Sequence, residues 1–95
     1  MRSFALGQTV ATRGVVELMA AEAVFGKFVS DSFKRYIYRD WGDTCESDWK
    51  LNDMSVSAKD RILAVYKHPE YEDWTIWIIT EWDRSVTTIL FPDEY

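Results

Sequence analysis

The sequence predicts an α+β fold, in which a three-stranded antiparallel meander packs against N-terminal helices. Two observations predict this class. Apolar residues recur at helical spacing in the first 40 residues. Runs of β-branched and aromatic residues, separated by short polar segments, fill residues 61–91 instead. The chain has 95 residues, 47% of them hydrophobic, and a chain of this length forms one domain that buries roughly two thirds of its unfolded surface.

The first part of the chain predicts a short extended segment followed by two helices. Residues 7–12 are extended, and Thr12 is a candidate N-cap for a helix over 15–23. Gly26 weakens the helical pattern, so we expect a break near residues 24–27. The second helix carries one apolar stripe, formed by Phe25, Val29, Phe33 and Tyr36.

The middle of the chain predicts a turn and a short helix. Gly42, within the segment 40–43, suits a turn that needs a positive φ angle. Thr44 is a candidate cap for a helix over 45–51. We expect residues 52–57 to be irregular.

The C-terminal third predicts the sheet. Residues 61–67 alternate weakly and form a strand, and residues 74–82 and 85–91 form a hairpin around one polar turn. Both faces of 74–82 are apolar in the middle, which is typical of a central strand covered on both sides. We therefore expect this strand to lie between the other two, with the helices of 15–37 over one face. Whether the short N-terminal strand joins an edge of the sheet stays open.

Charge is unevenly distributed along this acidic chain, whose net charge is −5. Residues 1–39 carry six basic and three acidic groups, whereas residues 40–95 carry five basic and thirteen acidic groups. Such an acidic surface repels nucleic acids and membranes. It serves either to keep the protein in solution or to dock a basic protein partner.

Cysteine and aromatic content narrow the class further. Cys45 is the single cysteine, so no internal disulfide can form, which fits a reducing compartment. We see no signal peptide and no stretch as long as a membrane span, and we expect a cytoplasmic protein without a cofactor. Five Trp, five Tyr and five Phe exceed the needs of a core this small. Some of these rings should lie in a groove or at a subunit contact, and a homodimer is one alternative.

Four segments are distinctive in their order and spelling: 6–12 (LGQTVAT), 40–43 (DWGD), 61–66 (RILAVY) and 77–95 (WIITEWDRSVTTILFPDEY). Together they resemble a small family of uncharacterised bacterial proteins that are carried on mobile elements and described as plasmid-related proteins. The resemblance implies the genomic setting of the chain, and the family has no established reaction. In this chain Arg13, Tyr36 and Arg39 stand where that family usually has proline, histidine and glycine. Tyr36 cannot replace a histidine in proton transfer near neutral pH.

Acidic residues crowd the segment around Trp41 and Trp49. The cluster consists of Asp40, Asp43, Glu46, Asp48 and Asp53. Clustered carboxylates can bind Mg²⁺ or Ca²⁺, although their spacing here fits no EF-hand loop. Carboxylates that form turns or face water explain the cluster equally well.

His68 and Cys45 are further candidates for chemistry. His68 precedes Pro69 in an acidic loop, where an imidazole can act as a general base. No motif ties a nucleophile to it, so we expect an exposed loop histidine. Cys45 lies in an acidic neighbourhood, which does not favour a reactive thiolate.

Basic residues offer two more interpretations. Arg84 can pair with Glu81 or with the turn at 40–43, which would hold one turn against another, or it can bind an anion. Basic groups near aromatic rings favour single-stranded nucleic acids, and this pattern comprises Lys27, Lys34, Arg35 and Arg39 beside Tyr36, Tyr38 and Trp41. The sequence pI of 4.7 argues against that function.

We predict a small acidic module that binds another macromolecule, with a protein as the expected partner, and that does not act by catalysis. Its predicted binding residues combine aromatic anchors with charge at turns, and they are Trp41, Asp43, Trp49, Trp82, Asp83 and Arg84. The resemblance implies an accessory or anti-defence role, for example an acidic inhibitor that occupies a partner's nucleic-acid surface. The alternatives are a metal-assisted hydrolase that uses the carboxylate cluster and a regulatory nucleic-acid-binding protein.

Overall fold

A computed structural model describes residues 4–95 of the chain. It has the α+β class that the sequence predicts, so that prediction is confirmed. In chain order the elements are β1 (Gln8–Ala11), α1 (Arg13–Ala21), α2 (Ala23–Ile37), α3 (Glu46–Ala58), β2 (Ile62–Lys67), β3 (Thr75–Thr80), β4 (Val86–Leu90) and the 3-10 helix η1 (Pro92–Glu94).

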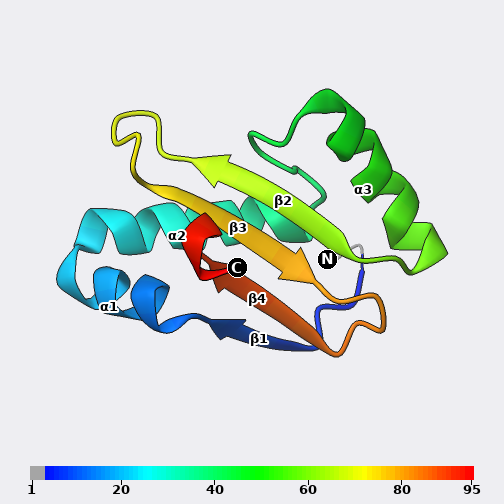
Figure 1. Cartoon of the computed structure of the whole chain (residues 1–95), viewed down its shortest axis with the longest axis horizontal. Coiled ribbons are helices and arrows are strands. Elements are labelled where there is room, and N and C mark those ends of the chain that lie inside the picture. The colour runs from blue at the N-terminus through cyan, green and yellow to red at the C-terminus, as the bar shows by residue number, and fades with distance from the viewer. Residues whose placement is uncertain (1–3) are drawn as a thin grey trace.

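The strands form one mixed sheet in the order β1-β4-β3-β2 (Figure 1). β2, β3 and β4 make the predicted antiparallel meander, with Ala64 opposite Ile78 and Ile78 opposite Ile89. The prediction of three strands is incomplete, because β1 adds a fourth strand at the edge. β1 runs parallel to β4, with Thr9 opposite Thr87.

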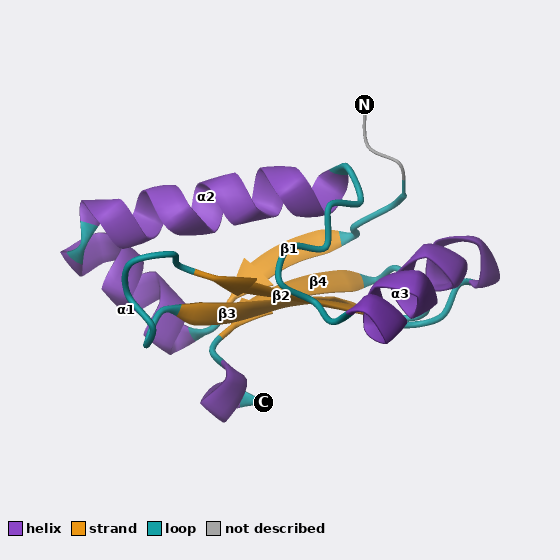
Figure 2. Ribbon diagram, turned by 90° about the horizontal axis from the view of Figure 1, so that it is seen from above, coloured by secondary structure: helices purple, strands orange, loops and turns teal. Residues whose placement is uncertain are grey.

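Helices cover one face of the sheet (Figure 2). α2 lies across this face and α1 packs beside α2, as the sequence predicts for this part of the chain. α3 lies at the end of the sheet, where it contacts β2. η1 lies on the opposite face, and the ring of Tyr95 after it lies 5.6 Å from the ring of Trp77 in β3.

The core fills the space between α2 and the sheet. The predicted apolar stripe of α2 contributes Phe25, Val29 and Tyr36, which are buried, and Phe33, which is half-buried. Alternate residues of the strands meet this stripe, since side chains of a strand point to each face in turn. They are Ile62, Ala64, Tyr66, Ile76, Ile78 and Ile89.

A chain of buried hydroxyl groups crosses this core. Tyr36 Oη lies 2.6 Å from Thr80 Oγ1, which lies 2.8 Å from Thr87 Oγ1. Thr87 Oγ1 lies 2.7 Å from the carbonyl oxygen of Leu6 and donates to it. Burial raises the pKa of Tyr36 well above its usual value, so its hydroxyl stays neutral. Tyr36 thus helps to link α2, the sheet and the N-terminal segment.

The boundary between α1 and α2 differs from the predicted one. The break lies at Glu22, whose backbone is extended, two residues before the region 24–27 near which it was expected, and Gly26 lies inside α2. Thr12 does precede α1, but its side chain makes no capping hydrogen bond. Its hydroxyl instead donates to Glu94 Oε1 at 2.5 Å, which ties η1 to the start of α1.

α3 is longer than the predicted helix over 45–51, and the expectation of irregular structure at 52–57 is wrong. The cause is that the two buried residues of this helix, Asn52 and Ser55, are polar. Asn52 is buried, and its side chain donates to the carbonyl of Leu63 at 2.8 Å and accepts from the Leu63 N–H at 3.3 Å. Such a contact with β2 gives no apolar periodicity that sequence reasoning could detect.

The predicted cap of α3 is also displaced by one residue. Cys45 is the N-cap, and Thr44 lies before it. The Thr44 hydroxyl donates to the carbonyl of Trp41 and accepts the N–H of Val65 at 2.9 Å. Thr44 therefore fastens the turn at 40–43 to β2 instead of capping the helix.

Candidate functional site

The turn between β3 and β4 presents Trp82, Asp83 and Arg84 in sequence. Arg84 adopts a φ angle of +59°, and its N–H donates to the carbonyl of Glu81 at 2.9 Å. Asp83 Oδ1 accepts hydrogen bonds from the hydroxyl of Ser85 at 2.6 Å and from the Ser85 N–H at 3.1 Å. These bonds hold the pKa of Asp83 below its usual value, so the carboxylate is charged and the turn is ordered.

Arg84 joins this turn to the C-terminal end of α3. Its guanidinium donates to the carbonyl oxygens of Asp60 at 2.8 Å, Glu81 at 3.0 Å and Ser55 at 2.8 Å. The Ser55 carbonyl belongs to the last turn of α3 and also accepts the backbone N–H groups of Lys59 and Asp60, and carbonyls at this end of a helix attract cations. Arg84 thus holds one turn against another element, but through carbonyls, and the predicted pairing with carboxylates is wrong.

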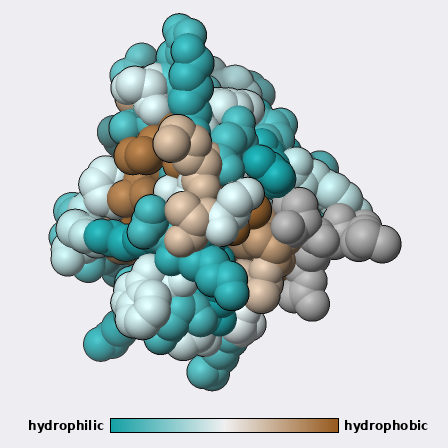
Figure 3. Space-filling view, turned by 90° about the vertical axis from the view of Figure 1, so that its right-hand side faces the viewer, coloured by the Kyte–Doolittle hydropathy of each residue, from teal (hydrophilic) through white to brown (hydrophobic). Residues whose placement is uncertain are grey.

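A groove lies beside this turn, between the end of α3 and the first described residues of the chain. We call it the hairpin groove. It has a volume of about 550 Å³, and its lining residues are Phe4, Ala5, Val56, Lys59, Trp82, Asp83 and Arg84. Figure 3 views this end of the molecule and shows apolar atoms gathered across its middle, surrounded by hydrophilic ones.

The walls of the hairpin groove are fixed by contacts beneath them. Gly7 has a φ angle of +64°, and a Cβ atom there would collide with the carbonyl oxygens of Arg84 and Ser85. Glycine therefore allows the N-terminal segment to approach the turn closely. The ring of Phe4 rests on those of Tyr36 and Trp41, with centroid distances of 5.5 and 5.8 Å.

The structure brings three of the six predicted binding residues together in this groove. Trp82 is 65% exposed, which is unusual for so large a ring, while Asp83 is exposed and Arg84 is half-buried. Trp41 is fully buried, and its Nε1 donates to Asp53 Oδ1 at 3.0 Å. Trp41 therefore supports the groove from below and has no surface to offer a partner.

The other two predicted residues lie elsewhere. Trp49 is half-buried and packs against the core from α3. Asp43 accepts the N–H of Lys67 at 2.8 Å, at the end of β2 that pairs with the start of β3. The hairpin turn follows the end of β3, so Asp43 belongs to the opposite end of the sheet.

The clustered carboxylates do not converge on one point. Asp40 accepts two hydrogen bonds from the Arg35 guanidinium, at 2.9 and 3.2 Å, and these hold the pKa of Asp40 below its usual value. Asp53 binds Trp41, and Glu46 pairs with Lys50 at 3.4 Å. Within residues 4–95, no three His, Cys, Asp or Glu side chains are grouped so that they could hold a metal ion.

His68 lies in the loop after β2, as expected, but the expectation that it is exposed is wrong. It is half-buried, and the rings of Phe28, Tyr71 and Trp74 lie 5.3, 4.9 and 5.2 Å from its own. Cys45 is exposed, and its Sγ lies 3.6 Å from Ser47 Oγ. His68 therefore contacts aromatic rings, whereas the neighbour of the Cys45 thiol is a hydroxyl group.

The predicted pattern of basic groups beside stacking rings is only partly present. Tyr36 and Trp41 are buried in the core, whereas Tyr38 is exposed. Of the basic groups, Lys27 pairs with Asp31 at 2.7 Å, and Arg39 lies 3.5 Å from Asp53. Two of the three rings therefore cannot stack on a nucleic-acid base.

Sequence reasoning missed the part of the groove that α3 supplies. Val56 and Lys59 come from the end of that helix, in and after the stretch that was expected to be irregular. Lys59 adopts a left-handed conformation that ends the helix. Val56 is an apolar residue after a polar stretch, which is a weak sign of a packed surface. It would have indicated the groove only if α3 had been predicted at its full length.

Comparisons of the chain with protein-family models, with curated proteins and with solved structures find no match. Among residues 4–95, no helix is both long enough and apolar enough to cross a membrane.

Proposed function

We propose that this protein is a protein-binding module that uses the hairpin groove to engage a partner with an apolar side chain flanked by basic groups. The observation that carries the proposal is the exposure of Trp82 beside an ordered groove. Tryptophan and arginine are the residues most enriched among those that dominate binding energy, and such residues lie next to pockets that exclude water.

The size of the exposed ring supports a useful contribution to binding. Trp82 is 65% exposed, which leaves about 150 Å² to cover and corresponds to at most about 4 kcal/mol at 25 cal/mol per Å². Arg84 and Asp83 order the turn before binding, so little conformational entropy is lost when a partner docks.

Charge favours a basic partner. The groove itself is lined by Lys59, Arg84 and Asp83, and the Arg84 guanidinium is taken up by backbone carbonyls. Asp60 and Glu81 lie beside the same turn, and residues 40–95 have thirteen acidic groups against five basic ones. Complementary charge accelerates association and selects among partners. The concrete form is an acidic inhibitor that occupies a partner's nucleic-acid surface, and the resemblance to plasmid-related proteins supports an anti-defence role for it.

The proposal is tested by capturing proteins from a bacterial lysate on the immobilised chain and then measuring the affinity of the captured partner. Trp82→Ala should weaken binding at least tenfold, which is about 1.4 kcal/mol. Met54→Ala is the matched control, because Met54 is a similarly exposed apolar residue of α3 that does not line the groove. Equal retention by both variants would remove the hairpin groove as the binding surface.

A second pair of variants tests the role of charge. Asp83→Asn keeps an oxygen that can accept from Ser85 but removes the charge, whereas Asp93→Asn makes the same change in η1. The first should slow association and the second should not, and added salt should reduce the difference. A captured nucleic acid, or binding that strengthens with salt, would contradict an acidic surface that docks a basic protein.

A further inference from the structure

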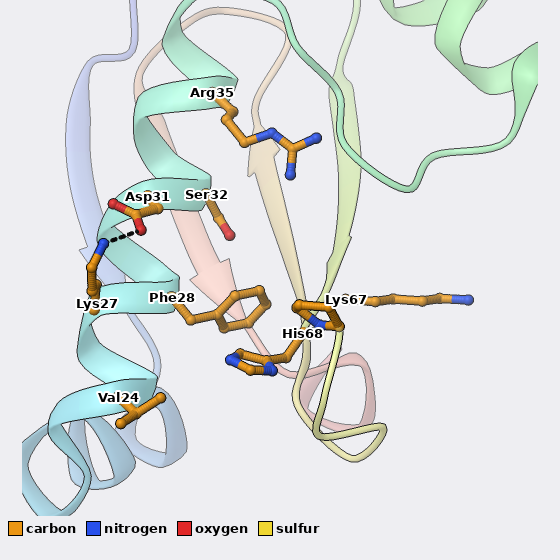
Figure 4. A pocket seen from close by; sticks show the side chains of 9 residues that line it. Val24, Lys27, Phe28, Asp31, Ser32, Arg35, Lys67 and His68 are labelled. Atoms are coloured by element: carbon orange, nitrogen blue, oxygen red, sulfur yellow. Dashed lines mark hydrogen bonds and ion pairs between the residues drawn. The ribbon is translucent and has the colours of Figure 1, made fainter.

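A second pocket lies between α2 and the end of β2, and we call it the α2–β2 pocket (Figure 4). Its volume is about 290 Å³, near the lower end of the range of roughly 300–1,000 Å³ that holds small organic ligands. Lys67 and His68 line it from the end of β2 that lies away from the hairpin groove. The two sites are therefore separate.

One cation points into this pocket from α2. Lys27, Arg35 and Lys67 line it with one carboxylate, Asp31, but in Figure 4 the ammonium group of Lys67 extends away from α2 and that of Lys27 lies beside Asp31, whereas Arg35 extends toward β2. A guanidinium in a concave place attracts anions. Arginine and lysine together suit phosphate, since one supplies directed paired donors and the other a mobile point charge.

Two further groups in the pocket can donate hydrogen bonds to an anion. Ser32 lines the pocket although only 2% of the residue is exposed, and Figure 4 shows its side chain leaving α2 on the pocket side. His68 Nδ1 accepts the N–H of Glu70 at 3.0 Å, so the neutral ring carries its proton on Nε2. In Figure 4 the imidazole extends from the end of β2 toward α2.

The pocket also has an aromatic side. The ring of Phe28 lies 5.3 Å from that of His68, and both line the pocket. Trp74, whose ring lies 5.2 Å from His68, helps to fix the imidazole in place. An organic group attached to the anion would meet these rings, and a bare phosphate ion would leave most of the volume empty.

The existing ion pairs do not block such a ligand. Lys27 and Asp31 form an exposed pair on the helix surface, with 76% and 51% of their side chains accessible, and pairs of this kind contribute little to stability. Lys27 can therefore turn from Asp31 to a ligand at small cost. Arg35 is held by Asp40 at 2.9 Å, which fixes its position at the pocket wall.

We propose that the α2–β2 pocket binds a small organic phosphate monoester, such as a nucleoside monophosphate. Lys27, Arg35, Ser32 and the His68 Nε2–H hold the phosphate, and Phe28 contacts the organic part. Asp31 opposes the negative charge and so limits the affinity. This site is independent of the hairpin groove.

The test is a titration of the isotopically labelled full chain with adenosine 5′-monophosphate at low salt, followed by NMR and calorimetry. Shift changes are expected at residues of the α2–β2 pocket. Lys27→Gln and Ser32→Ala should each weaken binding at least fivefold, whereas Asp31→Asn should strengthen it. Lys50→Gln is the matched control, because Lys50 forms an equally spaced exposed pair with Glu46 on α3 and lies outside the pocket.

Inorganic phosphate, ribose 5-phosphate and adenosine serve as comparison ligands. Tighter binding of the nucleotide than of inorganic phosphate and of adenosine is expected, since the pocket combines cations with rings. Equal affinity for inorganic phosphate would overturn the assignment to an organic phosphate. No shift changes in the pocket at millimolar nucleotide, or an equal loss of affinity in Lys50→Gln, would overturn the site. Trp82→Ala should leave nucleotide binding unchanged, which keeps this result separate from that for the hairpin groove.

Discussion

Replacement of Arg84 by methionine tests the contact that holds the hairpin turn against α3. Methionine keeps much of the length of the side chain but cannot donate to carbonyls. It would remove the hydrogen bonds from the guanidinium to Ser55, Asp60 and Glu81. The Ser55 carbonyl at the end of α3 would keep only its backbone partners, the N–H groups of Lys59 and Asp60.

The expected loss of stability follows from the number of these bonds. Hydrogen bonds to a charged group contribute about 1.5–3 kcal/mol each, and partial exposure of Arg84 reduces this to about 1 kcal/mol each through competition from water. Three bonds therefore amount to about 3 kcal/mol in the free energy of unfolding. For a domain of this size, that loss lowers Tm by about 12–24 °C.

The assay is urea denaturation at neutral pH, with thermal melting as a second measurement. Arg84→Gly refines it, because Arg84 has a φ angle of +59°, and glycine relieves about 1 kcal/mol of left-handed strain. Glycine should thus lose less stability than methionine at this position. Arg61→Met is the control, because Arg61 is an exposed arginine that lies over the ring of Tyr95 at 5.0 Å.

A small effect would refute this reasoning. If Arg84→Met melts within about 3 °C of the unchanged protein, a difference worth less than about 1 kcal/mol, the guanidinium does not hold the turn. If Arg84→Gly is the less stable of the two variants, backbone strain at this turn does not contribute as described.

Three other substitutions test features of the fold by the same denaturation measurements. Asn52→Ala should lose about 2 kcal/mol, because it removes the side-chain partner of a part-buried N–H and carbonyl of β2; a loss below about 0.5 kcal/mol would contradict this role. Gly42→Ala should lose at least about 2 kcal/mol, since Gly42 has a positive φ angle and a Cβ atom would collide with the Tyr66 ring, and an unchanged midpoint would argue against that close approach. Asp40 has a lowered pKa because Arg35 binds it, so its contribution is present above the unfolded pKa of about 3.9 and is lost as pH falls through the lower folded pKa. As the pH is lowered from about 5 to about 2.5, the free energy of unfolding should therefore fall less for Asp40→Asn than for the unchanged protein. Parallel curves of this free energy against pH for the two proteins would contradict the linkage.

The strands were predictable because runs of β-branched and aromatic residues are separated by short polar turns. Ile76 and Ile78 face the core, and Trp77 and Ile79 face the other side, as alternation requires. The partner of β1 was not predictable, because a pairing between residues 8–11 and 86–89 leaves no local trace in the sequence. Edge pairing of a four-residue strand depends on hydrogen bonds that any sequence can make.

The candidate site was predictable in part. The turn chemistry around Trp82 pointed to residues at a corner, and the structure places them beside a groove. Composition could not distinguish the exposed Trp82 from the buried Trp41, because both tryptophans lie beside acidic residues at turns. The basic pocket was hidden because Lys67 and His68 are distant in sequence from Lys27 and Arg35.

The position of β1 also affects how the chain is made. β1 leaves the ribosome early, yet the strand that it pairs with, β4, is the last of the sheet to be synthesised. The complete sheet therefore cannot form until β4 has been synthesised, and until then the apolar faces of α1 and α2 are not fully covered. Nascent chains that stop before residue 86 should be digested readily by proteases, whereas released chains should resist them.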